Sequence, residues 1–373
     1  MIGRLTSAAS LALLLQASSL PVPSAAPLEA IHRDIGASVY GNVDRLYVMR
    51  KGTVVADHSY PRDYRAISRG RVTPIGCGEG CADASWMHEF NYLHPDWHPY
   101  YKGRDIHTLQ SVTKSIAATA IGIALQRGEI RSLDQPFLEH FADKDLSRVD
   151  PRLRTATIAD LLTMRSGIEW HEQDRPLGDS NTTIQLERSK DWIQFTLDQP
   201  MDAAPGAKWV YNSGGSQLLS GIIRHATGRF IDDYAREQLF APLGITDFYW
   251  KKTPTGHPDT EGGLYLAPAA LARIGELYLR DGVWNGQRIL PAGWVQQATA
   301  RHAKGVSPGW DYGYQWWITS QDGLDVWAGR GFGGQLLLVI PARETVAVVY
   351  SWNVFGGPAR NLAPPLMAAL AGG

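Results

Sequence analysis

The stretch from Ser111 to Leu125 reads Ser-Val-Thr-Lys-Ser-Ile-Ala-Ala-Thr-Ala-Ile-Gly-Ile-Ala-Leu and places a hydroxyl and an amine ahead of an apolar run. The alanines and leucine favour a helix, and the scarcity of charge predicts that most of its sides are buried. Residues three apart share a helical face, so Lys114 is expected beside the Ser111 hydroxyl. The helix start also directs backbone N–H groups toward Ser111, where they stabilise an anion. Together these features predict an acyl-transfer site, although the bare Ser-x-x-Lys spacing is more often a solvated helix face.

Composition and charge bound the range of functions. With 373 residues, of which 44% are hydrophobic and 20% charged, the chain has the composition of an ordinary globular protein. Its formal net charge is −1 and no run of Lys or Arg stands out, which excludes an electrostatic basis for binding nucleic acid or an anionic membrane. The expected partners are small molecules or neutral polymers, and the oligomeric state stays open.

The first 26 residues have the pattern of a secretory signal peptide. Arg4 precedes an apolar segment from Ala8 to Leu20, and the small residues Ser24-Ala25-Ala26 follow it. The alternative is an N-terminal anchor helix, but the apolar segment is too short to span a bilayer. We therefore expect residues 1–26 to be removed on export, which leaves a periplasmic or secreted chain without a stable membrane span.

Two cysteines, Cys77 and Cys81, lie in the glycine-rich hexapeptide Gly-Cys-Gly-Glu-Gly-Cys. In an exported protein such a pair can form a disulfide, and a bridge that closes so short a loop stiffens it only locally. A metal site is the weaker alternative, because two cysteines supply too few soft ligands. Whether they are bridged stays open.

Strand patterns lie toward both ends of the chain, with helical patterns between them. Residues 45–56 predict a hairpin that turns at Lys51-Gly52, and residues 59–107 an irregular excursion. Helices are expected over 111–128, 157–164, 216–227, 230–239 and 271–279, and strands over 312–318, 326–328, 335–340 and 345–352. The pattern predicts an α/β fold, in which an antiparallel sheet flanked by helices is formed from both termini (about 40–128 and 262–373) and a mainly helical domain (about 129–261) is inserted.

Two further segments are candidates for the same site. Tyr211 lies between a turn signal and a predicted helix, so it can point into a cleft, although a packed aromatic is the commoner role for a lone tyrosine. Residues 329–335, Gly-Arg-Gly-Phe-Gly-Gly-Gln, have an open backbone that allows a close approach. If this segment lies beside the Ser111 helix start, the N–H groups of Ser111 and Phe332 form an oxyanion hole. The alternative is a glycine-rich turn or bulge.

With these three segments in this order, the chain resembles the serine hydrolases related to class C β-lactamases, a family that includes D,D-peptidases, esterases and 6-aminohexanoate-dimer hydrolases. The resemblance extends from about Arg45 to Trp352. It includes further segments that look like those of the family, namely Thr157 to Gly167, Phe240-Ala241-Pro242-Leu243-Gly244-Ile245, Gly262-Gly263-Leu264-Tyr265 and Tyr312-Gly313-Tyr314.

The resemblance implies a β-lactamase/D,D-peptidase-like fold and a role for each matching residue. Ser111 is the acylated nucleophile, Lys114 and Tyr211 are the proton-transfer pair, and no metal or cofactor is needed. Ser213 stands where the family usually places the asparagine of its Tyr-x-Asn element, which here comes one place early. The third element, usually Lys-Thr-Gly or His-Thr-Gly, matches Gly329-Arg330-Gly331, so binding of a substrate carboxylate depends on Arg330 turning inward. Ser213, Arg330 and Gly331 are therefore the expected substrate-binding residues.

Two proton routes are open. A neutral Lys114 needs its pKa lowered by more than three units from about 10.4, which costs on the order of 4–5 kcal/mol. Alternatively, a charged Lys114 lowers the phenol pKa of Tyr211, and the tyrosinate takes the serine proton. Because the two groups are coupled, we assign the role of base to them jointly.

The expected reaction is cleavage of an ester or amide through an acyl-enzyme, with a β-lactamase or D,D-peptidase as the alternative. A metallohydrolase built on His88, His94, His98 and His107 lacks the metal-ligand spacing, and the Gly-x-Ser-x-Gly of a Ser/His/Asp hydrolase is absent. A catalytically silent ligand-binding relative is the alternative from another class. Aromatic residues are candidates for the cleft wall or the core, namely Trp86, Trp97, Tyr100, Trp316 and Trp317.

Overall fold

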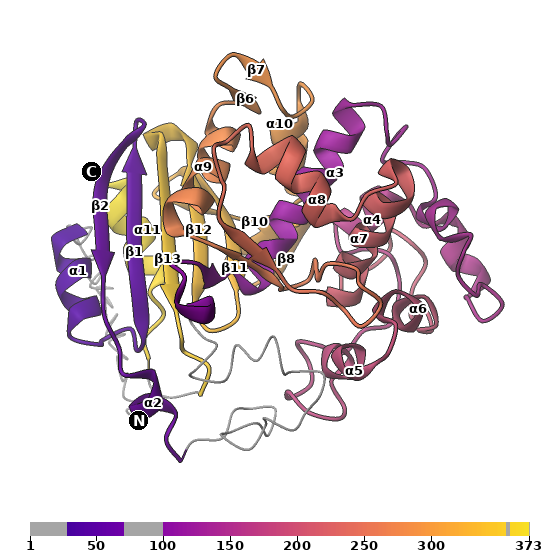
Figure 1. The fold of residues 1–373 in the computed structure, drawn as a ribbon, viewed down its shortest axis with the longest axis horizontal. Helices are drawn as coiled ribbons and strands as arrows, with labels where there is room; N and C mark the ends of the chain where they lie inside the picture. Colours follow the sequence, from indigo (N-terminus) through magenta and orange to yellow (C-terminus); the bar gives the residue numbers. More distant parts are fainter. Residues whose placement is uncertain (1–27, 71–99, 356–358, 373) are drawn as a thin grey trace, which may run out of the picture.

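The computed structural model describes residues 28–70, 100–355 and 359–372. Its centre is an eight-stranded antiparallel sheet in the order β2-β1-β13-β12-β11-β10-β9-β8 (Figure 1). The N-terminal strands of this sheet are β1 (Val43–Arg50) and β2 (Thr53–Ser59). The C-terminal strands are β8 (Ala303–Ser307), β9 (Trp310–Tyr312), β10 (Trp317–Gln321), β11 (Leu324–Gly331), β12 (Gln335–Ile340) and β13 (Thr345–Ser351). The predicted antiparallel sheet drawn from both ends of the chain is confirmed.

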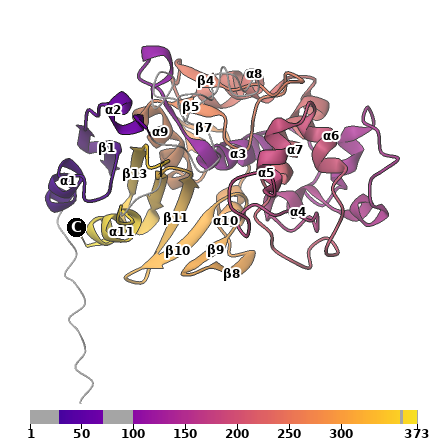
Figure 2. The same ribbon diagram turned by 90° about the horizontal axis from the view of Figure 1, so that it is seen from below.

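The middle strands are buried on both faces, which explains their almost unbroken apolar sequences. In β12, Leu337 and Val339 join one hydrophobic cluster, whereas Leu336, Leu338 and Ile340 join the other. Helices α1 (Leu28–Gly36) and α11 (Ala363–Ala371) belong to the second cluster, and α3 (Thr113–Gln126) and α9 (Pro268–Leu279) to the first. The sheet therefore lies between two helical layers (Figure 2).

Most remaining helices gather to one side of the sheet, around α3 and α7 (Ser213–Thr227) (Figure 1). They are α4 (Ile158–Leu162), α5 (Thr182–Arg188), α6 (Trp192–Leu197) and α8 (Ile231–Ala235), with η4 (Phe137–Phe141), η5 (Pro151–Thr155) and the π-type turn η6 (Arg236–Phe240). The other elements are α2 (Tyr64–Ser68), α10 (Trp294–Ala298), η2 (Tyr101–Gly103), η3 (Gln110–Val112), η7 (Pro341–Arg343), the small sheet of β3 (His107–Thr108), β5 (Leu264–Leu266) and β4 (Phe248–Trp250), and the hairpin of β6 (Val283–Trp284) and β7 (Gln287–Arg288).

Helix α3 is buried along almost its whole length, as its apolar sequence predicts. It packs against α7, and a Cβ at its Gly122 would stand 2.5 Å from the Trp294 ring, so a close neighbour replaces a side chain there. This central position holds the start of α3, and with it Ser111, between the sheet and the helical region.

Several sequence-based boundaries need correction. The strand expected over 312–318 is two strands, because Gln315 adopts a positive φ of 58° and its side chain is drawn into the core by bonds to the Leu161 and Leu162 carbonyls. The helix expected from residue 216 begins at Ser213, because Asn212 caps it. The helix expected over 230–239 is a short α8 followed by the π-type turn.

Some predictions fall outside the described residues. These are the signal peptide, Cys77, Cys81, Trp86, Trp97 and three of the four histidines considered as metal ligands.

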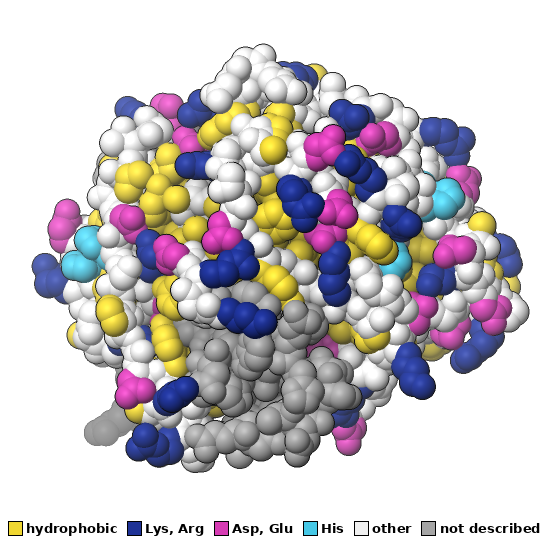
Figure 3. Space-filling view, in the orientation of Figure 1, with side chains coloured by type: hydrophobic (Ala, Val, Ile, Leu, Met, Phe, Trp, Pro, Cys, Tyr) yellow, Lys and Arg dark blue, Asp and Glu magenta, His cyan; other side chains and the backbone are white. Residues whose placement is uncertain are grey.

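Within the described ranges, no group of three or more His, Cys, Asp or Glu side chains has an arrangement that could hold a metal ion. None of the helices in those ranges has the length and hydropathy needed to cross a bilayer. On the face seen in Figure 3, basic and acidic side chains are interspersed, as the small net charge suggests.

Candidate active site

Ser111 lies in the short turn η3, immediately before α3. The preceding residue, Gln110, has a positive φ of 48°, a conformation that costs energy for a non-glycine residue. The Gln110 side chain donates a hydrogen bond to the Thr108 hydroxyl, which holds the turn in place. The strained turn presents Ser111 in the wall of a cavity of about 700 Å³.

Lys114 lies one helical turn after Ser111, on the same face, as predicted. Its ammonium donates to the Ser111 Oγ at 3.0 Å and to the Glu261 carbonyl at 2.6 Å. The side chain is only 1% exposed, so it serves internal partners rather than extending to solvent. These two bonds fix the ammonium against the hydroxyl.

Tyr211 meets the same pair from the helical region. Its ring centroid is 5.2 Å from the Lys114 Nζ, and the nearby Ser111 hydroxyl acts to lower the pKa of its phenol. The ring stacks on Trp317, with centroids 5.7 Å apart and planes at 26°. Trp317 on strand β10 thus orients Tyr211, which comes from a loop more than 100 positions earlier in the chain.

The pKa shifts differ from the sequence-based expectation. Burial raises the pKa of Tyr211, and Glu172 adds to the increase, so that the lowering by the Lys114 charge is outweighed. For Lys114, burial alone would lower the pKa, but the negative potential of Tyr211, Glu261 and Glu172 raises it. Both groups therefore hold their protons above their ordinary ranges, and the lysine is an ammonium at neutral pH.

Glu172 is a wall residue that sequence reasoning missed, because it lies in a polar run without a motif. Its two carboxylate oxygens accept from Ser213 Oγ at 2.8 Å, from the Ser213 amide at 3.0 Å and from Trp170 Nε1 at 3.0 Å. These bonds anchor a carboxylate in the cavity wall opposite the sheet. A buried tryptophan flanked by an acidic residue was the only available sequence signal.

Ser213 lies behind this wall rather than in it. Its side chain is buried and its hydroxyl is committed to Glu172, so the cavity meets the glutamate instead of the serine. Asn212 is also withdrawn, because its Oδ1 accepts from the Gly215 amide and caps α7. The altered Tyr-x-Asn order therefore has a structural basis: the asparagine stabilises the helix and a carboxylate takes its place at the cavity.

The glycine-rich segment runs beside the Ser111 turn, as predicted. A Cβ at Gly331 would stand 2.4 Å from the Leu109 carbonyl, and one at Gly329 would stand 2.8 Å from Val112, so only glycine allows this approach. Phe332 follows at the end of β11 and lines the cavity together with Gly331. Its amide as an oxyanion donor stays a prediction.

Arg330 also lines the cavity. Its guanidinium carbon lies 4.7 Å from the ring centroid of Trp310 and 4.9 Å from that of Trp317, a double cation–π contact. Burial lowers its pKa, yet an arginine remains charged at neutral pH. Among the described residues no carboxylate forms an ion pair with it, so a positive charge is held inward beside Tyr211.

Three comparisons identify the family. A model described as Beta-lactamase matches residues 42–372 of the chain. The chain belongs to the beta-lactamase family. It is 27% identical to the 6-aminohexanoate-dimer hydrolase of Paenarthrobacter ureafaciens over 271 residues, which cover 66% of this chain and 67% of that protein. It is 25% identical to the lovastatin esterase of Penicillium rubens over 214 residues, which cover 51% and 52% of the two chains.

Solved structures share the fold of this chain. An octameric penicillin-binding protein homologue from Pyrococcus abyssi superposes with a TM-score of 0.63 at 22% identity, over 92% of this chain and 77% of that one. The chain is thus a serine hydrolase with the fold of the β-lactamases and penicillin-binding proteins. Among the other aromatic candidates, Trp316 belongs to the core of this beta-lactamase fold and Tyr100 lines a different hollow.

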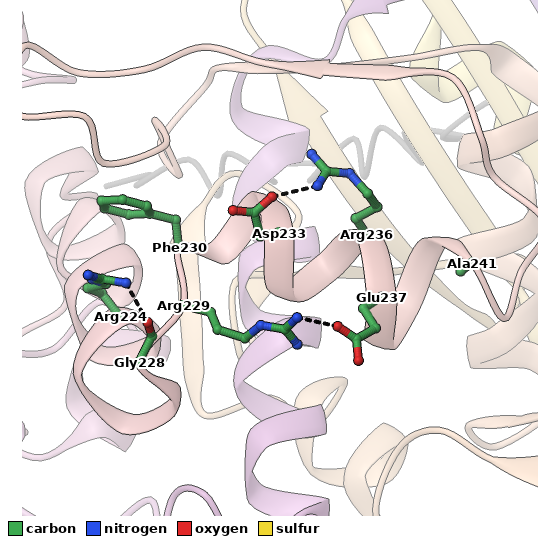
Figure 4. A pocket seen from close by; sticks show the side chains of 8 residues that line it. All are labelled: Arg224, Gly228, Arg229, Phe230, Asp233, Arg236, Glu237 and Ala241. Atoms are coloured by element: carbon green, nitrogen blue, oxygen red, sulfur yellow. Dashed lines mark hydrogen bonds and ion pairs between the residues drawn. The ribbon is translucent and has the colours of Figure 1, made fainter.

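A second depression of about 540 Å³ lies between α7 and η6. Figure 4 shows its three arginines engaged with nearby partners: Arg224 with the Gly228 carbonyl, Arg229 with Glu237, and Arg236 with Asp233. We refer to this depression as the α7–α8 groove. It has no serine, cysteine or lysine in its wall, so it lacks a counterpart of Ser111 and of Lys114.

Proposed function

We propose that the protein cleaves an ester or amide of a small molecule through an acyl-enzyme at Ser111. Lys114 and Tyr211 move the protons as one unit, and the amides of Ser111 and Phe332 hold the oxyanion. The observation that carries the proposal is the 3.0 Å hydrogen bond from the Lys114 ammonium to Ser111 Oγ, with Tyr211 beside the same ammonium in the wall of the same cavity. A serine that lies with two proton-transfer groups at the wall of a cavity has the arrangement that nucleophilic catalysis requires.

The proton route starts from the resting state of these groups. Because the Lys114 ammonium already donates to Ser111, the serine proton is free to point toward the Tyr211 oxygen. The reactive form is the Lys114–Tyr211 unit that has lost one proton, in which the adjacent ammonium stabilises a Tyr211 phenolate. This phenolate accepts the Ser111 proton as Ser111 attacks and becomes a neutral phenol. The same tyrosine is positioned to pass the proton to the leaving group.

The substrate side of the proposal rests on Arg330 and Gly331. An inward guanidinium held between two tryptophans suits a carboxylate or another anionic group on the substrate. Relatives named as an aminohexanoate-dimer hydrolase and an esterase support an amide or ester as the reacting bond. The penicillin-binding homologue supports the second candidate, a β-lactamase or D,D-peptidase.

The test is intact-mass spectrometry after exposure to a fluorophosphonate, with Ser111→Ala as the matched control. A single adduct on the wild type that is lost in the variant is expected. A panel of p-nitrophenyl esters, nitrocefin and a linear aminohexanoate amide then ranks esterase, β-lactamase and amidase activities. Full turnover by Ser111→Ala would overturn the proposal, and absence of an adduct on folded wild type would favour a silent binding relative.

Export belongs to the same proposal and rests on the sequence of residues 1–26. The expected result is a mature protein of reduced mass in the periplasm or medium, with an N-terminus near residue 27. A full-length mass in the cytoplasm would contradict it.

A further inference from the structure

The cavity of about 700 Å³ is lined by a second charged group besides Arg330, the carboxylate of Glu172. Glu172 lies in the segment between α4 and α5, on the helical side of the cavity, whereas Arg330 lies on strand β11 of the sheet. The acids nearest to Glu172 in the chain, Glu169 and Asp174, are hydrogen bonded to His171. Among the described residues Glu172 takes part in no ion pair, so no charge of opposite sign balances it there.

Three hydrogen bonds fix the Glu172 carboxylate. Its Oε1 accepts from Ser213 Oγ at 2.8 Å, and its Oε2 accepts from the Ser213 amide and from Trp170 Nε1, each at 3.0 Å. The Ser213 amide is the first of α7, where unpaired N–H groups and the helix dipole favour a negative charge. Trp170 is itself confined, because a Cβ at Gly214 would stand 2.5 Å from its ring. The carboxylate is therefore held in one position.

The anchored carboxylate still has room for a ligand. It has about four acceptor positions, of which the three bonds leave one open, on Oε1. Its charge reaches the reacting groups, since it contributes to the raised pKa of both Tyr211 and Lys114. A neutral substrate that covered this carboxylate would remove its water without replacing it, which costs free energy. A substrate with a positive group at the same place avoids that cost.

We propose that Glu172 is a specificity-determining residue that binds an ammonium group of the substrate. The inference rests on the proposed function, because it concerns the substrate that Ser111 attacks. Arg330 on the sheet side is already assigned to a carboxylate, so the substrate class becomes a zwitterion: an ester or amide that carries both an amine and a carboxylate. Glu172 is anchored by hydrogen bonds and Arg330 by two tryptophan rings, so both charges stay available to a ligand.

The same hydrogen bonds would also serve a purely structural role, in which Glu172 caps α7. Glu172→Gln separates the two roles, because it removes the charge and keeps the anchor. The amide oxygen of glutamine can accept from the Ser213 amide and from Trp170, and its NH₂ group can donate to the Ser213 hydroxyl. A structural role therefore survives this substitution, whereas binding of an ammonium group does not.

The experiment measures the rate of Ser111 labelling, by intact mass, with paired fluorophosphonates. Each pair has an alkyl chain of one length that ends in either an ammonium or an acetamide group, attached to the phosphorus or to its ester oxygen. In the wild type, the ammonium probe of the length that reaches Glu172 should react about 10-fold faster or more than its partner. In Glu172→Gln this ratio should fall to about one. The ratio compares two probes on one protein, so a changed Tyr211 pKa cancels.

Glu169→Gln is the matched control. Glu169 lies three positions away, outside the cavity lining, and its partner is His171, so the variant should keep the wild-type ratio. An unchanged ratio in Glu172→Gln, or an equal loss of rate for both probes, would overturn the proposed ammonium binding.

The wild type alone also tests the inference, in case Glu172→Gln fails to fold. A third probe that ends in a hydroxyl group has nearly the shape of the ammonium probe without its charge, and it should react as slowly as the acetamide probe. Equal rates for the ammonium and hydroxyl probes at every chain length would overturn the inference. Absence of any Ser111 adduct would instead refute the proposed function, so the two failures are distinguishable.

Discussion

The Ser111 cavity and the α7–α8 groove both contain arginine, but they use its charge differently. In the groove, Arg229 and Arg236 are about half exposed and pair with equally exposed carboxylates. In the cavity, Arg330 is held over two tryptophan rings without an acidic partner among the described residues. In the groove each arginine charge is balanced by a carboxylate, whereas in the cavity the arginine charge is left without an acidic partner among the described residues.

The difference shows which charges of the molecule bear on catalysis. Exposed ion pairs contribute little, because solvent screens them and both side chains lose freedom. Buried groups lose their hydration and interact strongly with neighbouring charges, which is why Tyr211, Lys114 and Glu261 all have shifted pKa values. Substitutions in the cavity should therefore change the reaction, and substitutions in the groove should not.

The largest effect is expected for Ser111→Ala. Removal of the nucleophile should lower kcat/KM by about 10⁴-fold or more, since no other hydroxyl contacts the Lys114 ammonium in the described structure. The measurement is ester hydrolysis with purified variant and wild type. Lys114 keeps its bond to the Glu261 carbonyl, so the melting temperature should barely change. A residual rate within tenfold of the wild type would mean that the reaction does not take place at Ser111.

Tyr211→Phe should come next, with a loss of about 10²–10³-fold in kcat. The phenyl ring retains the stacking on Trp317, so the loss reports the hydroxyl alone. Rates with p-nitrophenyl esters measure the contribution of the hydroxyl to catalysis, and a thermal melt measures the contribution of the ring to stability. If activity falls only when the fold also loosens, Tyr211 is a packing residue rather than a proton-transfer group.

These candidate site residues could be predicted from the sequence because they depend on local spacing. Ser111 and Lys114 are one helical turn apart, and Tyr211 and the glycines around Arg330 lie in recognisable segments. The apolar strands β12 and β13 were equally readable. Helix α11 was not predicted. It begins with Pro364 and Pro365 in its first turn, where the missing N–H of proline is not needed.

The charge environment of the site was not accessible, because it depends on burial and on contacts between distant segments. Glu172 and Glu261 are far apart in sequence and neither lies in a motif. The expectation that Lys114 lowers the pKa of Tyr211 overlooked Glu172 and the degree of burial. Trp310 likewise gave no sign that it covers Arg330.

The pH dependence provides a third test. Because the pKa values of Lys114 and Tyr211 are both raised, the base form is scarce at neutral pH and grows as pH increases. The value of kcat/KM should therefore rise with pH through and above neutrality, by up to about tenfold per unit below the midpoint. Stopped-time assays with a stable amide substrate avoid spontaneous ester hydrolysis. A rate that falls between pH 7 and 8 would contradict this sign.

Arg330→Ala should have a smaller and more selective effect. For substrates that carry a carboxylate, KM should rise by about 10-fold or more, because a charged hydrogen bond is lost. For neutral esters it should change little. Arg236→Ala in the groove is the matched control and should leave both KM values unchanged. Equal losses for charged and neutral substrates would assign Arg330 a packing role between its two tryptophans.

The smallest effect is expected where the groove's own pairing is broken. Asp233→Asn removes the carboxylate that accepts from Arg236, at a site where both side chains are about half exposed. The free energy of unfolding should fall by less than about 1 kcal/mol, and esterase and amidase rates should match the wild type. Urea unfolding and steady-state assays on one preparation measure both. If this variant instead altered turnover, the groove's arginines would act on the Ser111 cavity through α7, and pairing would no longer separate structural from functional charge.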